Sequence, residues 1–467
     1  METDISGKVQ IYNILADICS FIVHAHAKNY LVRYSCISAE EKSRIEDTIQ
    51  ANTPLQLNME GHFMPILESD ITDEFIDRLS LFAGNLMDVD DKNCIMRLIQ
   101  ALDSCLSHIL QDEIAQLQSR NTSHELNSNR AETGIELLPR CTCVWARKSR
   151  QSFSYRRLDN YLTHLMVIED DSTNENVVDE HIFIPKGFFK NFDATGQLKV
   201  AASPLSCRPN FDIRFHKSDD LQVFSLDYHS KEIDPFNRLI WDKIREAGAN
   251  SAEIVVFPEM LSNSETEGYI TDRIKELSSE EQETLPAMII LPTFFGEHIN
   301  VCSILDRHGH VMARQHKQNP YVMNCDHGEY MEDILGFGLI SIFHYEGIGR
   351  FAVLICKDFL TTRYMERIMR GFMLTLVFVP SYSTGAYDFK MSFDLCAHDY
   401  CNVVWINSCA AMIPGKENNF AYIGYTRKRI NRYQSESEAH HKMIPCDRLL
   451  TGKCNKDCLY YDSFGTV

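Results

Sequence analysis

The sequence predicts a mixed α/β protein in which a helical N-terminal domain precedes a domain of alternating strands and helices. Apolar residues recur every three or four positions through the first 120 residues, as on the buried face of a helix. From Asp220 onward, short β-branched runs alternate with amphipathic segments, which is typical of α/β domains. Glu259, Lys317 and Cys356 each follow a predicted strand, so the strand ends are where we expect a functional site.

The composition bounds the size and the partners of the protein. A chain of 467 residues predicts two or three domains at roughly 100 to 200 residues each. Hydrophobic residues make up 44% of the sequence, which is enough for a large core. The 46 basic and 65 acidic residues give a net charge of −19. This acidic excess argues against non-specific binding to the phosphate backbone of nucleic acids, because such binding needs positive charge.

The same sequence predicts a soluble, cytoplasmic protein with no membrane partner. No apolar run approaches the roughly 20 residues that span a bilayer. The acidic start METDISGK is unlike a secretory signal. The 16 cysteines are sparse for a chain of this length, and many lie within apolar runs. We therefore expect reduced thiols rather than a disulfide framework.

Residues 1–120 are predicted to form the helical domain. Amphipathic helices are expected at 8–33, 73–87 and 91–119. A more polar helix is expected at 39–50, where Ser38 and Glu41 form a capping-box pattern. Docking of a protein partner, dimerisation and a lid over a site are all roles that the sequence leaves open for this domain.

Residues 121–219 are predicted to be a linker followed by a small mixed region. The segment 121–136 is polar and lacks periodicity. A basic cluster follows, interleaved with Phe153 and Tyr155; its members are Arg147, Lys148, Arg150, Arg156 and Arg157. Such a cluster indicates either contact with RNA, DNA or an acidic protein, or a plain solvated face, and the solvated face is the simpler interpretation.

Residues 220–430 are predicted to form the α/β domain. Its buried strands are expected at 221–226, 252–257, 287–294, 374–379, 403–407 and 420–425, and its helices at 235–247 and 389–401. Two hairpins are expected, one pairing 300–306 with 309–316 and the other pairing 339–345 with 350–355. The second hairpin leads directly into Cys356.

Residues 431–467 are predicted to be a polar tail. The tail carries side chains of the types that bind zinc, namely His440, His441, Cys446, Cys454 and Cys458. Their separations do not reproduce a paired CxxC motif, so we predict no metal site.

Glu259, Lys317 and Cys356 form a chemically coherent set. A cysteine attacks a carbonyl or nitrile carbon best as the thiolate, and a carboxylate can accept the thiol proton as general base. A neighbouring lysine ammonium stabilises both the thiolate and the oxyanion that forms on attack. The product of such an attack is a thioester, which water then hydrolyses.

The segments that hold these residues resemble the motifs of the nitrilase, or carbon–nitrogen hydrolase, superfamily. VVFPEM, ARQHKQNPY, VLICKDF and VFVPSYS occur in the order of that family, over about 220–425. The resemblance implies an αββα sandwich, here preceded by the helical domain, and a catalytic triad of Glu259, Lys317 and Cys356. It also implies a homo-oligomer without cofactor or catalytic metal that acts on small amide, nitrile or ureido substrates.

Auxiliary residues follow less directly from the resemblance. The family has a helper glutamate between its lysine and its cysteine, for which Glu329 is the first choice and Glu332 the second. Lys357 stands where the family has a small or aromatic residue, and a second cation there would further depress the thiol pKa or bind an acidic partner. Asp358 is the third auxiliary candidate.

The leading hypothesis is thus an intracellular amidase or nitrilase-like hydrolase. The alternative is a nitrilase fold retained as a binding or oligomerisation scaffold, which could accompany a nucleic-acid-acting prokaryotic defence system. A glutaminase that feeds ammonia to a synthetase is a third interpretation, but the sequence shows no second active site for it.

Overall fold

The computed structural model describes residues 6–24, 29–120, 126–145, 157–170, 178–206, 208–230, 233–326, 328–336, 338–398, 401–411, 419–424, 443–445 and 458–465. The chain forms two compact units. The first comprises Met1–Cys141, Arg147–Thr173 and His181–Pro185, and the second comprises Thr142–Ala146, Asn174–Glu180 and Lys186–Val467. Among the described helices, none is both long and apolar enough to cross a membrane.

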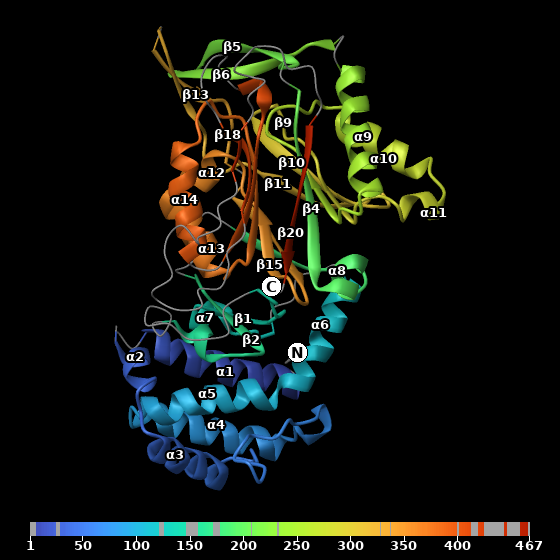
Figure 1. The fold of residues 1–467 in the computed structure, drawn as a ribbon. Helices are drawn as coiled ribbons and strands as arrows, with labels where there is room; N and C mark the ends of the chain where they lie inside the picture. The colour runs from blue at the N-terminus through green and yellow to red at the C-terminus, as the bar shows by residue number, and fades with distance from the viewer. Residues whose placement is uncertain are drawn as a thin grey trace, which may run out of the picture. The chain divides into compact units, whose positions relative to one another are not determined.

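Helices dominate the first unit, as the periodicity predicts (Figure 1). They are α1 (Gly7–His24), α2 (Tyr30–Tyr34), α3 (Ala39–Asn52), α4 (Asp73–Asp88), α5 (Lys92–Cys105), α6 (Ser107–Arg120) and α7 (Arg130–Thr133), with a 3₁₀ turn η1 (Glu68–Asp70). The predicted helices at 39–50 and 73–87 are confirmed. The single helix expected over 91–119 is instead two, because the backbone at Leu106 leaves helical geometry with ψ at 0°.

The cap of α3 forms only in part as expected. Ser38 Oγ accepts the backbone N–H of Glu41 at 3.1 Å, which satisfies one free donor of the first turn. The Glu41 carboxylate instead accepts two N–H groups of Arg44, at 2.8 and 3.0 Å. An ion pair three residues along the helix has thus replaced the second half of the capping box.

A pair of short strands completes the first unit. Strands β1 (Ile135–Pro139) and β2 (Leu165–Glu169) are antiparallel, and a 3₁₀ turn, η3 (Leu158–Tyr161), precedes β2. Both strands contribute side chains to the same core as α1, α3, α4 and α5. The compact unit therefore extends past residue 120, where the sequence pattern placed its end, because these strands bury their apolar side chains against the helices.

Two mixed sheets form the body of the second unit. In spatial order the first contains β11 (Val311–His316), β10 (Ile299–Asp306), β8 (Met288–Ile290), β7 (Ile254–Val256), β4 (Gln197–Leu205) and β20 (Cys458–Gly465), with β9 (Phe294–Gly296) paired to β10. The second contains β19 (Met443–Pro445), β18 (Asn419–Gly424), β17 (Asn402–Asn407), β16 (Leu376–Ser381), β15 (Gly349–Val353), β14 (Leu339–Tyr345) and β3 (Val178–Phe183).

Helices cover the outer faces of these sheets, which gives four layers (Figure 1). The sheets face one another, with β17 and β18 against β4 and with β14 against β11. Beside the first sheet lie α8 (Lys190–Thr195), α9 (Ile233–Ala249), α10 (Thr266–Lys275) and α11 (Ser279–Gln282). Beside the second lie α12 (Lys357–Leu360), α13 (Thr362–Gly371) and α14 (Tyr387–His398), and the turn η6 (Cys409–Ala411) follows β17.

A smaller four-stranded sheet lies at one end of the second unit (Figure 1). Its spatial order is β12 (Val322–Cys325), β13 (Gly328–Glu332), β6 (Leu221–Tyr228) and β5 (Phe211–Ser218). The strand predicted at 221–226 is therefore confirmed as a strand, but it lies in this small sheet rather than in the main sandwich. An isolated apolar run shows that a strand forms and not which sheet it joins.

The boundaries of the second unit also differ from the prediction. Strand β4 begins before residue 220, and β20 lies within the segment predicted as a tail. The two pair along their length, from Gln197 with Gly465 to Leu205 with Cys458. This pairing joins segments that are too far apart in sequence for a local pattern to relate them. Cys458 belongs to that strand, whereas His440, His441, Cys446 and Cys454 lie outside the described residues.

The basic cluster of the middle region is described only at one end. Arg147, Lys148, Arg150 and Arg156 lie outside the described residues. Arg157 pairs with the buried carboxylate of Asp159 at 3.1 Å. The one described member of the cluster thus has a partner within its own unit.

Candidate active site

The three residues predicted at strand ends occupy those positions in the second unit. Glu259 follows β7 after a Phe–Pro step, Lys317 directly follows β11, and Cys356 follows β15. The hairpins that deliver Lys317 and Cys356 are confirmed as β10–β11 and β14–β15. All three side chains are buried, with exposed fractions of 1%, 1% and 6% in chain order.

The turn of the β14–β15 hairpin shows why its sequence contains two glycines. Gly347 and Gly349 have φ values of +89° and +86°, a region that favours glycine over other residues. A Cβ at position 349 would also lie 2.9 Å from Thr375 Oγ1. The turn therefore fixes the register in which β15 approaches Cys356.

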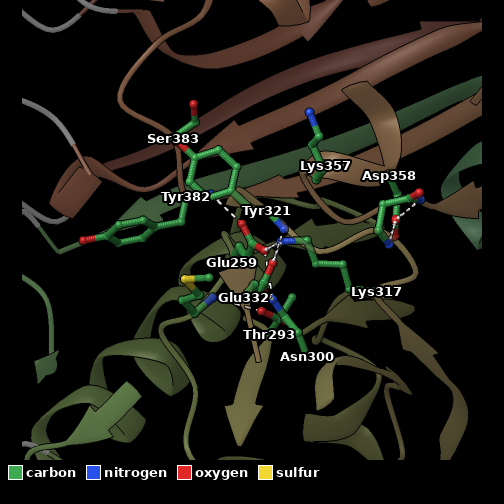
Figure 2. Close-up of polar contacts among 12 residues, drawn as sticks. Glu259, Thr293, Asn300, Lys317, Tyr321, Glu332, Lys357, Asp358, Tyr382 and Ser383 are labelled. Carbon is green, nitrogen blue, oxygen red and sulfur yellow. Dashed lines mark hydrogen bonds and ion pairs between the residues drawn. The ribbon is translucent and has the colours of Figure 1, made fainter. Parts of the chain in front are cut away.

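Lys317 lies between two carboxylates (Figure 2). Its ammonium donates to Glu259 Oε1 at 2.8 Å and to Glu332 Oε2 at 2.5 Å. Glu332, at the end of β13, is fully buried. Because the ammonium occupies the space between the carboxylates, it supplies the positive charge that a bound metal would supply in such a pair.

Asn300, on β10, ties the same two carboxylates together. Its side-chain Nδ2 donates to Glu259 Oε1 at 2.9 Å and to Glu332 Oε1 at 2.8 Å. Its backbone carbonyl accepts the N–H of Lys317 at 2.8 Å. Asn300 thus fixes the spacing of the glutamates and anchors the backbone of the lysine.

The second sheet contributes a backbone donor to Glu259. The N–H of Tyr382, just after β16, donates to Glu259 Oε2 at 2.9 Å. The N–H of Glu259 in turn points to the carbonyl of Ser381 at 3.4 Å. Glu259 is therefore bound on one oxygen by the first sheet and on the other by the second.

Cys356 has an unusual backbone conformation. Its φ is +44° and its ψ is −97°, in a region where a side chain other than glycine costs about 1–3 kcal/mol. Its N–H donates to the carbonyl of Pro380 at 2.9 Å, and its carbonyl accepts the N–H of Phe359 at 3.1 Å. These bonds hold the turn in the strained conformation that carries the thiol from the strand end.

Electrostatic coupling joins the thiol to Glu259 and Lys317. Burial raises the pKa of Cys356, the Glu259 charge raises it further, and the Lys317 ammonium and the N–H of Tyr382 lower it. Burial also raises the pKa of Glu259, against the effects of Lys317 and of a hydrogen bond with Cys356. The pKa of Lys317 is raised, because Glu259, Glu332 and Cys356 together outweigh its desolvation, so this lysine is an ammonium.

The structure reverses the order of the two helper candidates. Glu329, the first choice, is exposed on β13 and faces Asn324 of β12 in register. Glu332, the second choice, contacts Lys317. Both lie in the segment between the lysine and the cysteine, but they are three positions apart, so the strand's alternation places them on opposite faces.

The other two auxiliary candidates, Lys357 and Asp358, are the first two residues of α12, and their side chains point in different directions. Lys357 is half-buried and points away from the Glu259–Lys317 pair (Figure 2). It is therefore not placed to depress the thiol pKa, as the sequence had suggested. Asp358 is buried, and it accepts hydrogen bonds from Gln318 and Asn319, which directly follow Lys317.

Sequence reasoning missed three contributors to the site. Asn300 begins a hairpin arm and Tyr382 acts through its backbone, so neither carried a recognisable signal. Tyr321 donates its N–H to Glu332 Oε2 at 3.0 Å, and its side chain is 43% exposed. Burial raises the pKa of Tyr321, and the charge of Cys356 raises it further.

The solved structures that resemble this chain include amidases from Nesterenkonia sp. An amidase from Nesterenkonia sp. is 12% identical, with a TM-score of 0.38 over 58% of this chain and 92% of that chain. A mutant of the AN1 amidase, showing covalent addition of the acetamide moiety of fluoroacetamide at the active-site cysteine, has the same identity, TM-score and coverage. So has another mutant, described as a Nesterenkonia AN1 amidase from the nitrilase superfamily.

No protein-family model matches the sequence, and no curated protein matches it. The structural likeness to these amidases lies below a TM-score of 0.5.

Proposed function

We propose that this protein is a cysteine-dependent carbon–nitrogen hydrolase that acts on small amides, with related nitriles and ureido compounds as further substrates. The observation that carries the proposal is the buried Glu259–Lys317 ion pair, which is coupled to the thiol of Cys356. Burying a charged pair is costly, and a strained cysteine beside that pair has no evident role in stability.

The first half of the reaction transfers the acyl group to the enzyme. Glu259 accepts the proton of the Cys356 thiol, and the sulfur attacks the amide carbon to form a C–S bond. The carbonyl oxygen becomes an oxyanion, which the Lys317 ammonium stabilises. When the intermediate collapses, the C–N bond breaks, and Glu259 returns the proton to the departing nitrogen, so ammonia or an amine leaves a thioester behind.

The second half regenerates the enzyme. Glu259 accepts a proton from water as the water attacks the thioester carbon, and the C–S bond breaks. The thiolate recovers the proton and the carboxylic acid is released. One carboxylate thus serves twice as base and twice as acid, which suits a group whose pKa burial raises above its ordinary value.

Glu332 and Asn300 prepare Lys317 for this reaction. With two carboxylates around it, the lysine keeps its proton, so it acts as an electrostatic group and not as a base. The raised pKa of the thiol keeps Cys356 neutral in the resting site. The thiolate therefore forms when Glu259 accepts the proton, as the substrate reacts.

Alkylation by iodoacetamide tests the proposal. Cys356 should react faster than the other 15 cysteines, as measured by peptide mass spectrometry over time. Glu259→Gln should lower that rate about 10²–10⁴-fold, the range for loss of a general base, and Lys317→Ala should lower it as well. Glu267→Gln is the matched control, since Glu267 also pairs with a cation, Arg314, on the surface.

Two results would contradict the proposal. One is a Cys356 that reacts no faster than the remaining cysteines, which would favour the scaffold hypothesis. The other is a Glu259→Gln variant that reacts as fast as the Glu267→Gln control.

A further inference from the structure

Asp358 lies two residues after Cys356, and its carboxylate contacts the segment that follows Lys317. Oδ1 accepts the backbone N–H of Asn319 at 2.7 Å, the side-chain Nδ2 of Asn319 at 2.7 Å and the backbone N–H of Gln318 at 3.1 Å. Oδ2 shares the Gln318 donor at 3.1 Å. The N–H of Asp358 itself donates to the carbonyl of Ile355 at 3.0 Å.

The same segment is held on its other side by the side chain of Gln318. Gln318 Nε2 donates to the carbonyl of Leu339 at 3.1 Å, and Oε1 accepts the N–H of Gly338 at 2.7 Å. Leu339 begins β14, the first arm of the hairpin that leads to Cys356, and Gly338 directly precedes it. The backbone after Lys317 is thus held by two parts of the hairpin segment: the start of β14, through Gln318, and the turn after β15, through Asp358.

We propose that Asp358 is a positioning residue, whose carboxylate sets the distance between the Lys317 ammonium and the Cys356 thiol by holding Gln318 and Asn319. This inference rests on the proposed function, because it concerns the same nucleophile and the same cation. Lys317 belongs to the first sheet and Cys356 to the second, so their separation depends on how the two sheets are held together. Asp358, in the turn after β15, accepts hydrogen bonds directly from Gln318 and Asn319, in the turn after β11.

Hydrogen bonding, and not charge, is the property that this role requires. Oδ1 receives three of the donors, so an asparagine at this position keeps most of the contacts through its own carbonyl oxygen. Burial raises the pKa of Asp358 to about 7, so its charge changes near neutral pH while Oδ1 still accepts hydrogen bonds. Asn and Ala variants therefore separate the two properties.

The test compares Asp358→Asn, Asp358→Ala and Asn319→Ala in the full chain. We expect Asp358→Ala to lower the rate of Cys356 alkylation about 10²-fold, as misplacement of a reacting group by about 1 Å can do. Asp358→Asn should stay within a few-fold of wild type at every pH from 5 to 9. Asn319→Ala, which removes one donor, should lower the rate several-fold, and it serves should Asp358→Ala not fold.

Asp193→Ala is the control for a merely structural role. Asp193 also accepts a backbone N–H, from Gly187 at 2.8 Å, and a hydroxyl, from Tyr345 at 2.8 Å. It lies in α8, which precedes β4, whereas the site follows the far ends of the parallel strands. This variant should lower the melting temperature and leave the alkylation rate of Cys356 unchanged at temperatures where the protein is folded.

The outcomes distinguish the inference from the function on which it rests. A wild-type Cys356 with no enhanced reactivity overturns both. An enhanced wild-type rate that Asp358→Ala and Asn319→Ala leave within a factor of three overturns only the positioning role. An Asp358→Asn variant as slow as Asp358→Ala also overturns it, because charge would then be the property that matters.

Discussion

Two buried carboxylates, Asp103 in the first unit and Glu259 in the second, have nearly the same exposure and different partners. Their side chains are 2% and 1% exposed. Asp103, on α5, accepts the backbone N–H groups of Thr163, His164 and Leu165 at 2.7, 2.9 and 2.7 Å. Glu259 accepts from an ammonium, a side-chain amide and a single backbone N–H.

The different partners indicate a structural role for Asp103 and a chemical role for Glu259. The donors around Asp103 all belong to the backbone, so that carboxylate fixes the start of β2 against α5. Glu259 is bound mainly by side chains, one of which is charged, and it is coupled to a thiol. Exposure alone would not distinguish the two; the partners do.

The largest expected effect on stability is that of Lys317→Met. This change leaves Glu259 and Glu332 buried without their shared cation, and removing one partner of a buried pair costs about 3–5 kcal/mol. Urea unfolding should show the loss in the free energy of unfolding. Lys275→Met, at an exposed position of α10, should change it little. Equal stability of the two variants would mean that the buried cluster contributes nothing to folding.

A smaller effect is expected for Asp103→Asn. The variant keeps one acceptor but places an NH₂ group among three backbone donors, so we expect a loss of about 1–3 kcal/mol in the free energy of unfolding. Cys356 alkylation should be unchanged. The control is Asp112→Asn on the exposed face of α6. A changed alkylation rate in Asp103→Asn would break the distinction between the two carboxylates.

Glu259→Gln should show the opposite balance, with chemistry lost and stability kept or raised. Burial raises the folded-state pKa of Glu259, so between its ordinary value and that raised value the folded protein binds more protons than the unfolded chain. The stability of wild type relative to Glu259→Gln should therefore fall as pH rises through that window, by about 1.4 kcal/mol for each pKa unit. Unfolding curves at pH 4 to 8 measure this, and a difference that grows in favour of wild type would contradict the sign.

The smallest effect is expected for Glu329→Gln. Glu329 is exposed, so the free energy of unfolding should stay within about 0.5 kcal/mol of wild type and Cys356 should react normally. Glu332→Gln, in contrast, removes a charge that touches Lys317 and should slow alkylation. The alkylation rates of the Glu329→Gln and Glu332→Gln variants are compared under identical conditions. Slower alkylation in Glu329→Gln than in Glu332→Gln would restore the original choice of helper.

Strand ends and helices were predictable because their signals are local. The runs before Glu259 and Cys356 are short and apolar, the segment before Lys317 is the second arm of a predicted hairpin, and each forms a strand where the pattern placed it. The helix at 73–87 follows in the same way from its apolar stripe, and the polar helix at 39–50 follows from the capping pattern of Ser38 and Glu41. These features depend on contacts within a few residues, which a linear sequence displays directly.

The sequence by itself determined that a carboxylate, an amine and a thiol each follow a strand, since strand periodicity and residue type are both written in the chain. Only the tertiary structure decided that Glu332 rather than Glu329 contacts Lys317, and that Asn300 and the backbone of Tyr382 complete the set around Glu259. It also decided that β20 joins β4. The reason is that register and sheet order are set by which distant surfaces pack together, and a shift of one residue reverses the face that a side chain occupies.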